Sequence, residues 1–389
     1  MAITPASFAT YAGSPVPFTV TAQGAQPFVY RWYSNSVAIA GVTGAVYTNT
    51  TSVAGAYAIG CQVSNSYGAA ALVTASLTVV PLPTDLYGTT VLKAGPLAFW
   101  RLDEPTNATI AYDYVGGHNA TYNNAINGQP GFSSVIPSET STEFGATGLT
   151  PSIAEENGSD ANGVPLIDFS TQGANSAFTV EAWINEPLQN KSFLCKGYPN
   201  NTQFALDNGG SGGAYRFVVH NAAGTLVSAT ATGLLPDGNW HHVVGVCDQG
   251  NGTIRLYVDG KSQGTGSISP GAGLLALPSL YPVIIASQES QGGGSFTGPT
   301  NAFMGQVAMY GYALSASQVA SNYNAATVVA APTISIALSG ANIVVTYTGT
   351  LLSSTNVAQP VTNVVVGAAS PYTVPATNRQ VFFRSRSSP

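Results

Sequence analysis

Alternating apolar and polar residues form short runs along the whole chain, and the clearest example is LPDGNWHHVVGVCDQGNGTIRLYVDG at residues 235–260. The alternation predicts a β-hairpin, because successive side chains of a strand point to opposite faces. In the first strand His242 shares a face with Val244 and Val246, so His241 points to the opposite face. The two rings therefore cannot both reach one reacting atom or one metal ion from a regular strand.

The second strand of the hairpin repeats the pattern. Its expected core positions are Ile254, Leu256 and Val258,. Arg255 and Tyr257 alternate with them and are expected to face outward. We predict a structural role for both histidines, with His242 partly buried and His241 exposed. In that position His241 could line a ligand groove beside Arg255 or Tyr257.

Strand-like runs of this kind fill the chain, so the predicted fold class is all-β. Two prolines in VVPLPTDLYG predict a linker at 82–88,. The runs on either side of it predict domains at 1–81, 89–328 and 331–389. Only ALSASQVASNYNAA has helical spacing, and Ser315 is its expected N-cap,.

The composition narrows the class of partner. Only 7% of the residues are charged, with 11 basic against 17 acidic side chains, whereas an average soluble protein has about 25%. No basic stripe with aromatic residues occurs, which argues against nucleic-acid binding. No apolar run approaches the roughly 20 residues of a membrane span. Because the N-terminus lacks a signal peptide, we expect a piece of a larger exported protein with an added methionine.

The three cysteines are too far apart in sequence for a closely spaced metal motif,. Cys61, Cys195 and Cys247 are expected to be small buried residues. A disulfide between Cys195 and Cys247 stays open, since it requires that their strands are neighbours.

Residues 1–81 carry several residues typical of one β-sandwich family. They are Gly13 in YAGSPVPFTV, Trp32 in YRWYSN, and Gly55 and Tyr57 in AGAYAIGCQVSN. The segment resembles bacterial immunoglobulin-like domains, which implies that Trp32 is the core tryptophan and Tyr57 the corner tyrosine. Cys61 has no cysteine partner in FTVTA, so the core must hold without the usual disulfide.

The middle segment opens with AFWRLDE and YDYVGGHNATY and also contains FTVEAWINEP, NWHHVVGVCDQGNGTIRLYVDG and AMYGYALSASQVASNY. These motifs resemble the laminin-G-like, concanavalin-A-like jelly roll, which implies two curved antiparallel sheets packed face to face. Many members carry an Asp-Glu pair before the final helical element, whereas FMGQVAMYGYALS has no acid. Further on, LLSSTNV, SPYTVPA and VFFRSR resemble a short C-terminal β-module of exported bacterial proteins.

A glycoside hydrolase on this jelly roll would need two acidic side chains flanking the scissile bond. Related glucanases place them in a Glu-x-Asp-x-x-Glu pattern on one strand, and this pattern is absent. Glu181 in TVEAW is isolated and is the first suspect if the chain is an enzyme. Glu155, Glu156 and Asp160 in AEENGSD are expected to lie in a loop. The sequence shows no nucleophile elbow of a serine hydrolase, since its GxSxG match is the glycine-rich run GGSGG at 209–213,.

A structural calcium ion is one candidate cofactor, because RLDEP and YDYVGGHNATY supply oxygen ligands beside glycines that permit tight loops,. The candidate ligands are Asp103, Glu104, Asp113 and Asn119. Related jelly rolls often bind calcium near such loops. The alternative is ordinary turn chemistry.

A sugar site would need exposed aromatic faces flanked by amides. CKGYPNNTQF and AYRFVVHN supply such groups, including His220. With the hairpin, the predicted ligand-binding residues are Tyr198, Asn200, Asn201, Tyr215, His241, Arg255 and Tyr257. The alternative is that these are ordinary strand residues.

These observations favour a noncatalytic, extracellular or cell-surface binding or adhesion fragment whose jelly roll recognises a glycan or another surface ligand. One alternative is a polysaccharide-degrading glycoside hydrolase. A second alternative is a structural subunit of a surface fibre or virion.

Overall fold

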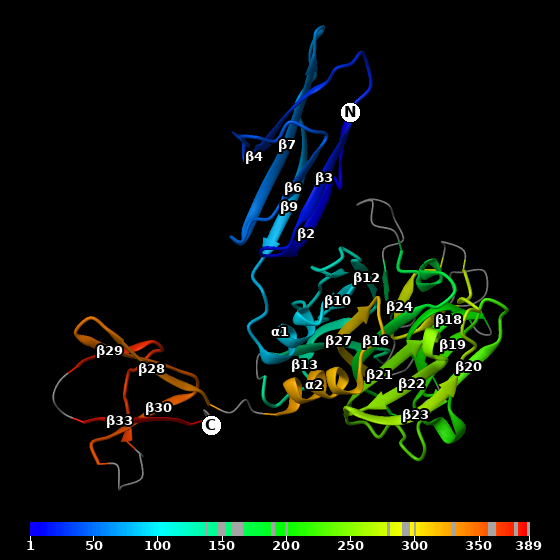
Figure 1. Cartoon of the computed structure of the whole chain (residues 1–389). Coiled ribbons are helices and arrows are strands. Elements are labelled where there is room, and N and C mark those ends of the chain that lie inside the picture. Colours follow the sequence, from blue (N-terminus) through cyan, green and yellow to red (C-terminus); the bar gives the residue numbers. More distant parts are fainter. Residues whose placement is uncertain are drawn as a thin grey trace. The chain divides into compact units, whose positions relative to one another are not determined.

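The computed structural model describes residues 1–136, 139–146, 153–156, 166–187, 191–198, 201–277, 281–289, 296–298, 301–328, 332–356, 363–376 and 380–386. Strands dominate, which confirms the all-β prediction (Figure 1). The chain divides into two compact units, Met1–Ala326 and Thr327–Pro389. Neither helix in the described part of the chain is long and apolar enough to cross a lipid bilayer.

Residues 2–80 form two sheets. The smaller has the order β1 (Ala2–Thr4), β3 (Val16–Thr21), β6 (Val46–Asn49). The larger has the order β2 (Ser7–Tyr11), β9 (Val73–Val80), β7 (Gly55–Asn65), β4 (Val29–Ser34), β5 (Val37–Ala38), with β8 (Gly68–Ala69) beside β7. The first strands therefore divide between the sheets: β1 pairs antiparallel with β3, and β2 pairs in parallel with β9.

Trp32 lies at the centre of this domain, as predicted. It is fully buried, and its indole Nε1 donates a hydrogen bond to the carbonyl of Gly44 at 2.9 Å. The hydroxyl of Tyr57 donates to the carbonyl of Val53 at 2.8 Å, the contact expected of a corner tyrosine,. Cys61 is buried and free, so apolar packing closes this core without a disulfide. Membership of the immunoglobulin-like family stays a prediction.

The jelly roll consists of two eight-stranded sheets. The first sheet has the order β13 (Ile126–Pro130), β14 (Thr140–Phe144), β27 (Ala302–Tyr310), β16 (Ala177–Asn185), β21 (Trp240–Asp248), β22 (Thr253–Val258), β23 (Lys261–Ser267), with β10 (Ala98–Trp100) paired to β27. The second sheet has the order β11 (Ile110–Ala111), β12 (Ala120–Asn123), β15 (Ile153–Glu156), β24 (Val283–Ile285), β17 (Ser192–Tyr198), β18 (Asn201–Asp207), β19 (Arg216–His220), β20 (Leu226–Thr230). A short pair, β25 (Gln288–Glu289) and β26 (Phe296–Thr297), follows β24.

The inner faces of the two sheets enclose the main core. Val243 and Cys247 of β21 lie in it, as do the predicted core residues Ile254, Leu256 and Val258 of β22. Gly245 allows the two sheets to approach closely, because a Cβ atom there would lie 2.3 Å from the ring of Phe217. Cys195 and Cys247 are both buried, and no disulfide joins them.

A second apolar cluster covers the outer face of the first sheet, beneath helices α1 (Leu86–Lys93) and α2 (Ala316–Thr327) (Figure 1). The N-cap prediction for α2 is confirmed. The hydroxyl of Ser315 accepts from the backbone N–H of Gln318, and the side chain of Gln318 accepts from the backbone N–H of Ser315. This reciprocal pair is a capping box.

The expectation of a single helix is wrong, because α1 lies across the end of the predicted linker. The side chain of Asp85 caps α1 by accepting from the backbone N–H of Gly88 at 2.6 Å. Tyr87 and Val91, one helical turn apart, are buried against the sheet. Tertiary packing therefore outweighs the weak helix propensity of a segment that contains Gly88 and two threonines.

The second unit contains two three-stranded sheets. Their orders are β28 (Ile334–Ser339), β29 (Asn342–Tyr347), β32 (Tyr372–Pro375), and β31 (Asn363–Val364), β30 (Thr350–Ser354), β33 (Phe382–Arg386). Its core is small, with Val345, Tyr347 and Leu351 buried at the centre. Every residue of β28 is exposed.

Candidate functional site

Glu181 and His242 lie on the outer face of the first sheet, fully buried beneath the helices. The Glu181 carboxylate accepts from the hydroxyl of Tyr310 at 2.8 Å and from the amide of Asn322, a residue of α2, at 3.1 Å. Nε2 of His242 lies 3.3 Å from Oε2 of Glu181. A catalytic carboxylate must touch its substrate, and the carboxylate of Glu181 is covered. Its hydrogen bonds with Asn322 instead hold α2 against the sheet.

The ring of His242 is part of an aromatic stack. It lies 5.1 Å from the ring of Trp183 at an interplanar angle of 29° and edge-on to Tyr87 of α1. The prediction that His242 is structural agrees with these contacts, although its burial is complete rather than partial. The predicted separation of the two histidines to opposite faces is confirmed, since Val244 lies in the outer cluster and Val243 in the inner core.

The prediction that His241 lines a ligand groove beside Arg255 or Tyr257 is wrong, because those two residues lie on the opposite face of the sheet. Tyr257 pairs with Val244 across the sheet and is buried in the outer cluster. Arg255 shares that outer face because it alternates with the inward Leu256. His241 lies on the other face. Tyr257 was expected in solvent because no sequence pattern indicates that helices cover this side of the strand.

His241 instead belongs to a polar cluster at the end of β21. Its Nδ1 lies 2.8 Å from Oδ2 of Asp259, and its Nε2 lies 3.2 Å from Oδ1 of Asp237. The hydrogen bond with Asp259 raises the pKa of His241, and the contact with Asp237 adds to this effect. The side chains are 12% exposed for His241, 31% for Asp259 and 53% for Asp237, so both carboxylates reach solvent. We call Asp237, His241 and Asp259 the rim cluster.

Two buried oxygen-bearing side chains lie close to the rim cluster. The ring of Tyr215 meets the ring of His241 edge-on at 5.8 Å, and its hydroxyl has no hydrogen-bond partner in the described structure. Glu186 accepts from the amide of Asn208 at 3.0 Å, while its second oxygen has no partner there. Burial raises the pKa of Glu186 to about 8, so this carboxyl is largely protonated at neutral pH,.

The prediction that Tyr215 offers an exposed aromatic face is therefore wrong. Tyr215 precedes β19 and turns into the core, where it also meets Phe193 edge-on. His220 is likewise buried, with Nδ1 2.6 Å from the carbonyl oxygen of Thr202, and burial lowers its pKa. His220 ends β19, in which four of the five residues are buried, and short-range alternation cannot reveal burial on both faces of a strand,.

The predicted sugar contacts Tyr198 and Asn201 lie on the paired strands β17 and β18. The two residues are directly opposite each other in this pair of strands, and both are half-buried. The ring of Tyr198 lies 5.0 Å from the ring of Tyr281. Asn200 lies outside the described residues. A sugar contact at Tyr198 and Asn201 stays a prediction.

The predicted calcium ligands are engaged by the protein. The carboxylate of Asp113 is fully buried and accepts four backbone N–H bonds at 2.9–3.0 Å, from Phe99, Val115, Gly116 and His118. The side-chain oxygen of Asn119 accepts from the backbone N–H of Asp113 at 3.0 Å. Among the described residues, no three side chains of His, Cys, Asp or Glu converge to hold a metal ion. Calcium binding by the four predicted residues stays a prediction, and it would require Asp113 and Asn119 to exchange protein hydrogen bonds for the ion.

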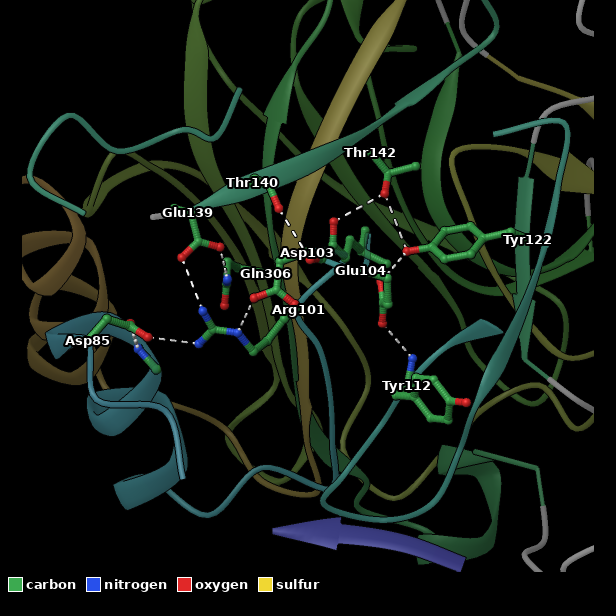
Figure 2. Close-up of polar contacts among 12 residues, drawn as sticks. Asp85, Arg101, Asp103, Glu104, Tyr112, Tyr122, Glu139, Thr140, Thr142 and Gln306 are labelled. Carbon is green, nitrogen blue, oxygen red and sulfur yellow. Dashed lines mark hydrogen bonds and ion pairs between the residues drawn. The ribbon is translucent and has the colours of Figure 1, made fainter. Parts of the chain in front are cut away.

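Asp103 belongs to a network around Arg101 (Figure 2). The guanidinium of Arg101 forms ion pairs with Asp85 at 2.9 Å, Asp103 at 2.7 Å and Glu139 at 3.2 Å. Because Asp85 is also the cap of α1, Arg101 fastens this helix to the sheet. Burial raises the pKa of Glu139 to about 7, and Gln306 donates a hydrogen bond to its carboxyl group.

Glu104 belongs to a second group of polar contacts (Figure 2). It accepts from the backbone N–H of Tyr112 at 2.8 Å and from the hydroxyl of Tyr122 at 2.7 Å. Burial raises the pKa of Glu104 to about 7. Glu104 and Asp113 thus hold turns in place, which was the alternative to calcium binding.

Glu155 and Glu156 end strand β15, so the expectation of a loop is wrong for these two residues. Asp160 lies outside the described residues. β15 pairs with β12 and β24 in the second sheet. Two adjacent acids with a glycine nearby do not favour a strand, so the pairing of β15 with β12 and β24 determines its conformation,.

Comparisons with known proteins agree with the jelly-roll prediction. Residues 157–320 match the family model described as the concanavalin A-like lectin/glucanases superfamily. A search of curated proteins gave no match.

Three solved structures illustrate the range of matches. The binding domain of botulinum neurotoxin serotype G is 12% identical, with coverage of 59% of this chain and 50% of that chain and a TM-score of 0.40. Domain 4 of AbnA, a GH43 extracellular arabinanase from Geobacillus stearothermophilus in complex with arabinotriose, is 16% identical, with coverage of 59% and 98% and a TM-score of 0.40. Trypanosoma rangeli sialidase is 14% identical, with coverage of 69% and 43% and a TM-score of 0.40. The chain thus spans half of the neurotoxin domain and less than half of the sialidase.

Proposed function

We propose that the jelly roll is a noncatalytic binding domain of an exported adhesion or binding protein, and that it recognises a carbohydrate or another extracellular surface ligand. The match of residues 157–320 to a superfamily of lectins and glucanases supports binding or cleavage of sugars. The position of the acids supports binding over cleavage. Glu181 is covered by α2, and the solvent-reaching carboxylates Asp237 and Asp259 both bind His241.

The rim cluster is the proposed place of ligand contact. Its carboxylates can accept hydrogen bonds from two hydroxyl groups of a sugar, and charge-assisted bonds of this kind are about twice as strong as neutral ones. Asn239 is exposed beside Asp237, so an amide adjoins the carboxylates, whereas Trp240 packs against the outer cluster on the opposite face. Carboxylates with an adjacent amide suit the hydroxyl groups of a sugar ring.

A glycan array combined with an assay for reducing sugar released from polysaccharides tests this proposal on the full chain. We expect binding without release. Release would establish the hydrolase alternative, and neither binding nor release would favour the structural subunit of a fibre or virion. Asp237→Asn with Asp259→Asn should reduce binding by about tenfold, the effect of 1.4 kcal/mol. Asp248→Asn, at the opposite end of β21, is the matched control and should bind like the unmodified chain.

A further inference from the structure

Charged residues are distributed unevenly along the chain. Residues 1–84 contain one charged side chain, Arg31, and all 17 acidic residues lie between positions 85 and 289. The second unit has no acidic residue, and its three basic residues are Arg379, Arg384 and Arg386. Its arginines therefore have no carboxylate side chain within the unit to neutralise them.

Two of these arginines share one face of β33 with an aromatic residue. Ser385 is buried and Phe383 packs against the core of the unit, so the alternate residues Phe382, Arg384 and Arg386 face outward. Both arginines are exposed and Phe382 is half-buried. Arg379 lies outside the described residues. Among the described strands β33 pairs only with β30, so this cationic strip follows an edge of its sheet.

We propose that the cationic strip, Phe382, Arg384 and Arg386, binds an acidic polysaccharide that carries carboxylate or sulfate groups on its sugars. A guanidinium group matches a carboxylate or sulfate with two parallel hydrogen bonds. Alternate residues of a strand are roughly 7 Å apart, so the two guanidinium groups can engage acidic groups on neighbouring sugars. The ring of Phe382 offers an apolar face on which a sugar ring can stack. This activity is separate from the function proposed for the jelly roll.

A nucleic acid is the less suitable partner for this strip. Double-stranded DNA carries one negative charge per about 1.7 Å of its axis, and proteins that bind it neutralise several phosphates with a broad basic surface. The strip has two described cations in a chain of net charge −6. A polymer with one acidic group per sugar has a lower charge density, so the acidic remainder of the chain repels it less.

The test measures binding of the full chain to sodium polygalacturonate and dextran sulfate by affinity electrophoresis, with neutral dextran and a single-stranded oligonucleotide as further probes. We expect retardation by at least one of the two acidic polysaccharides at low ionic strength, weaker retardation as salt is added, and none by neutral dextran. Arg384→Gln with Arg386→Gln should weaken binding by about tenfold, since each exposed charge-assisted contact contributes up to about 1 kcal/mol. Phe382→Ala should weaken it by a smaller factor.

Arg31→Gln is the matched control, because it also removes an exposed arginine but lies in the N-terminal domain. It should bind like the unmodified chain. Unchanged near-ultraviolet circular dichroism establishes that each variant is folded. Three results would overturn the proposal: no retardation by either acidic polysaccharide at low ionic strength, equal effects of the Arg31 and the Arg384–Arg386 substitutions, or tighter binding to the oligonucleotide. None of them bears on the rim cluster, whose test uses the glycan array and its own substitutions.

Discussion

His241 and His242 are neighbours in sequence, yet they occupy opposite kinds of surroundings. His242 lies in the covered outer face of the first sheet, with Glu181, Trp183 and the two helices around it. His241 lies in the rim cluster, where two carboxylates hold its ring and reach solvent. The covered outer face and the rim cluster each contain a histidine close to a carboxylate oxygen. The comparison teaches that a histidine's role depends less on its carboxylate neighbours than on whether other elements cover it. A covered histidine is structural, whereas one at the solvent-exposed rim can meet a ligand.

The largest expected effect comes from Glu181→Ala on the covered face. The substitution leaves the hydroxyl of Tyr310 and the amide of Asn322 buried without their acceptor. We expect a loss of about 3–5 kcal/mol in the free energy of unfolding, measured by urea denaturation. Asp237→Ala at the rim should cost less than about 1 kcal/mol, because its carboxylate is exposed to solvent. Equal losses for the two substitutions would contradict the distinction between the regions.

The pH dependence of stability should reflect the buried carboxyl groups. The pKa of Glu104 and of Glu139 is raised by burial from 4.5 to about 7, and that of Glu186 to about 8. A raised carboxyl pKa means that the folded state holds the proton more tightly. Stability is therefore highest below about pH 4.5 for these groups and falls as the pH rises towards 7–8. A single group shifted in this way contributes about 3 kcal/mol.

Melting temperatures measured across this pH range check the expected decline. Glu104→Gln should flatten the curve, because glutamine does not titrate while its side-chain oxygen can still accept from Tyr112. The raised pKa of His241 acts in the same direction above about pH 6.5, since its ion pairs weaken as the ring loses its proton,. A melting temperature that rises steadily from pH 5 to pH 8 would be the opposite of this expectation.

A direct comparison of the two histidines gives the next effect in size. His242→Ala removes a fully buried ring from its stack with Trp183 and should cost about 2–3 kcal/mol,. His241→Ala should cost less than about 1 kcal/mol and should instead weaken ligand binding at the rim. Denaturation curves and the glycan array, run on both variants, separate the two roles. If His242→Ala abolished binding while the domain kept its stability, the assignment of the two regions would have to be exchanged.

The smallest effect on the melting temperature is expected from the addition of calcium. The carboxylates of Asp113 and Glu104 already accept protein hydrogen bonds, so these turns need no ion to satisfy them. Melting curves recorded with calcium and with a chelator should coincide. An ion that binds only the folded state must raise the melting temperature, so a clear increase with calcium would restore Asp103, Glu104, Asp113 and Asn119 as candidate ligands.

Strand alternation was a reliable guide to which residues share a face. It separated His241 from His242 and placed Ile254, Leu256 and Val258 in the core, because the period of a strand is fixed by the backbone. Trp32 and Ser315 could also be predicted, since a core tryptophan and an N-cap are recognised from their immediate neighbours. These features depend on a few adjacent residues, and the structure agrees with each of them.

The sequence did not reveal which face of the sheet the helices cover, nor which residues far apart in the chain are in contact. Glu181 and Tyr257 are hidden by helices that lie far from them in the chain, and nothing in TVEAW or TIRLYV indicates this. β16 is apolar on both faces apart from Thr179, Glu181 and its last residue, Asn185, which was the one available signal of burial on two sides,. Glu186 and Asn208 meet through two different loops, and no sequence spacing predicts such a pair.

The two helices also determine how the jelly roll would respond to a pulling force. Helix α1 begins at Leu86, just after the last strand of the N-terminal domain, and α2 ends at Thr327, where the second unit starts. Tension that enters the jelly roll along the chain from either neighbour must therefore load a helix before it loads a sheet. Both helices are anchored on the same outer face, by Arg101 with Asp85 on one side and by Glu181 with Asn322 on the other. These polar contacts are thus among the first in the jelly roll to carry the load when the chain is stretched.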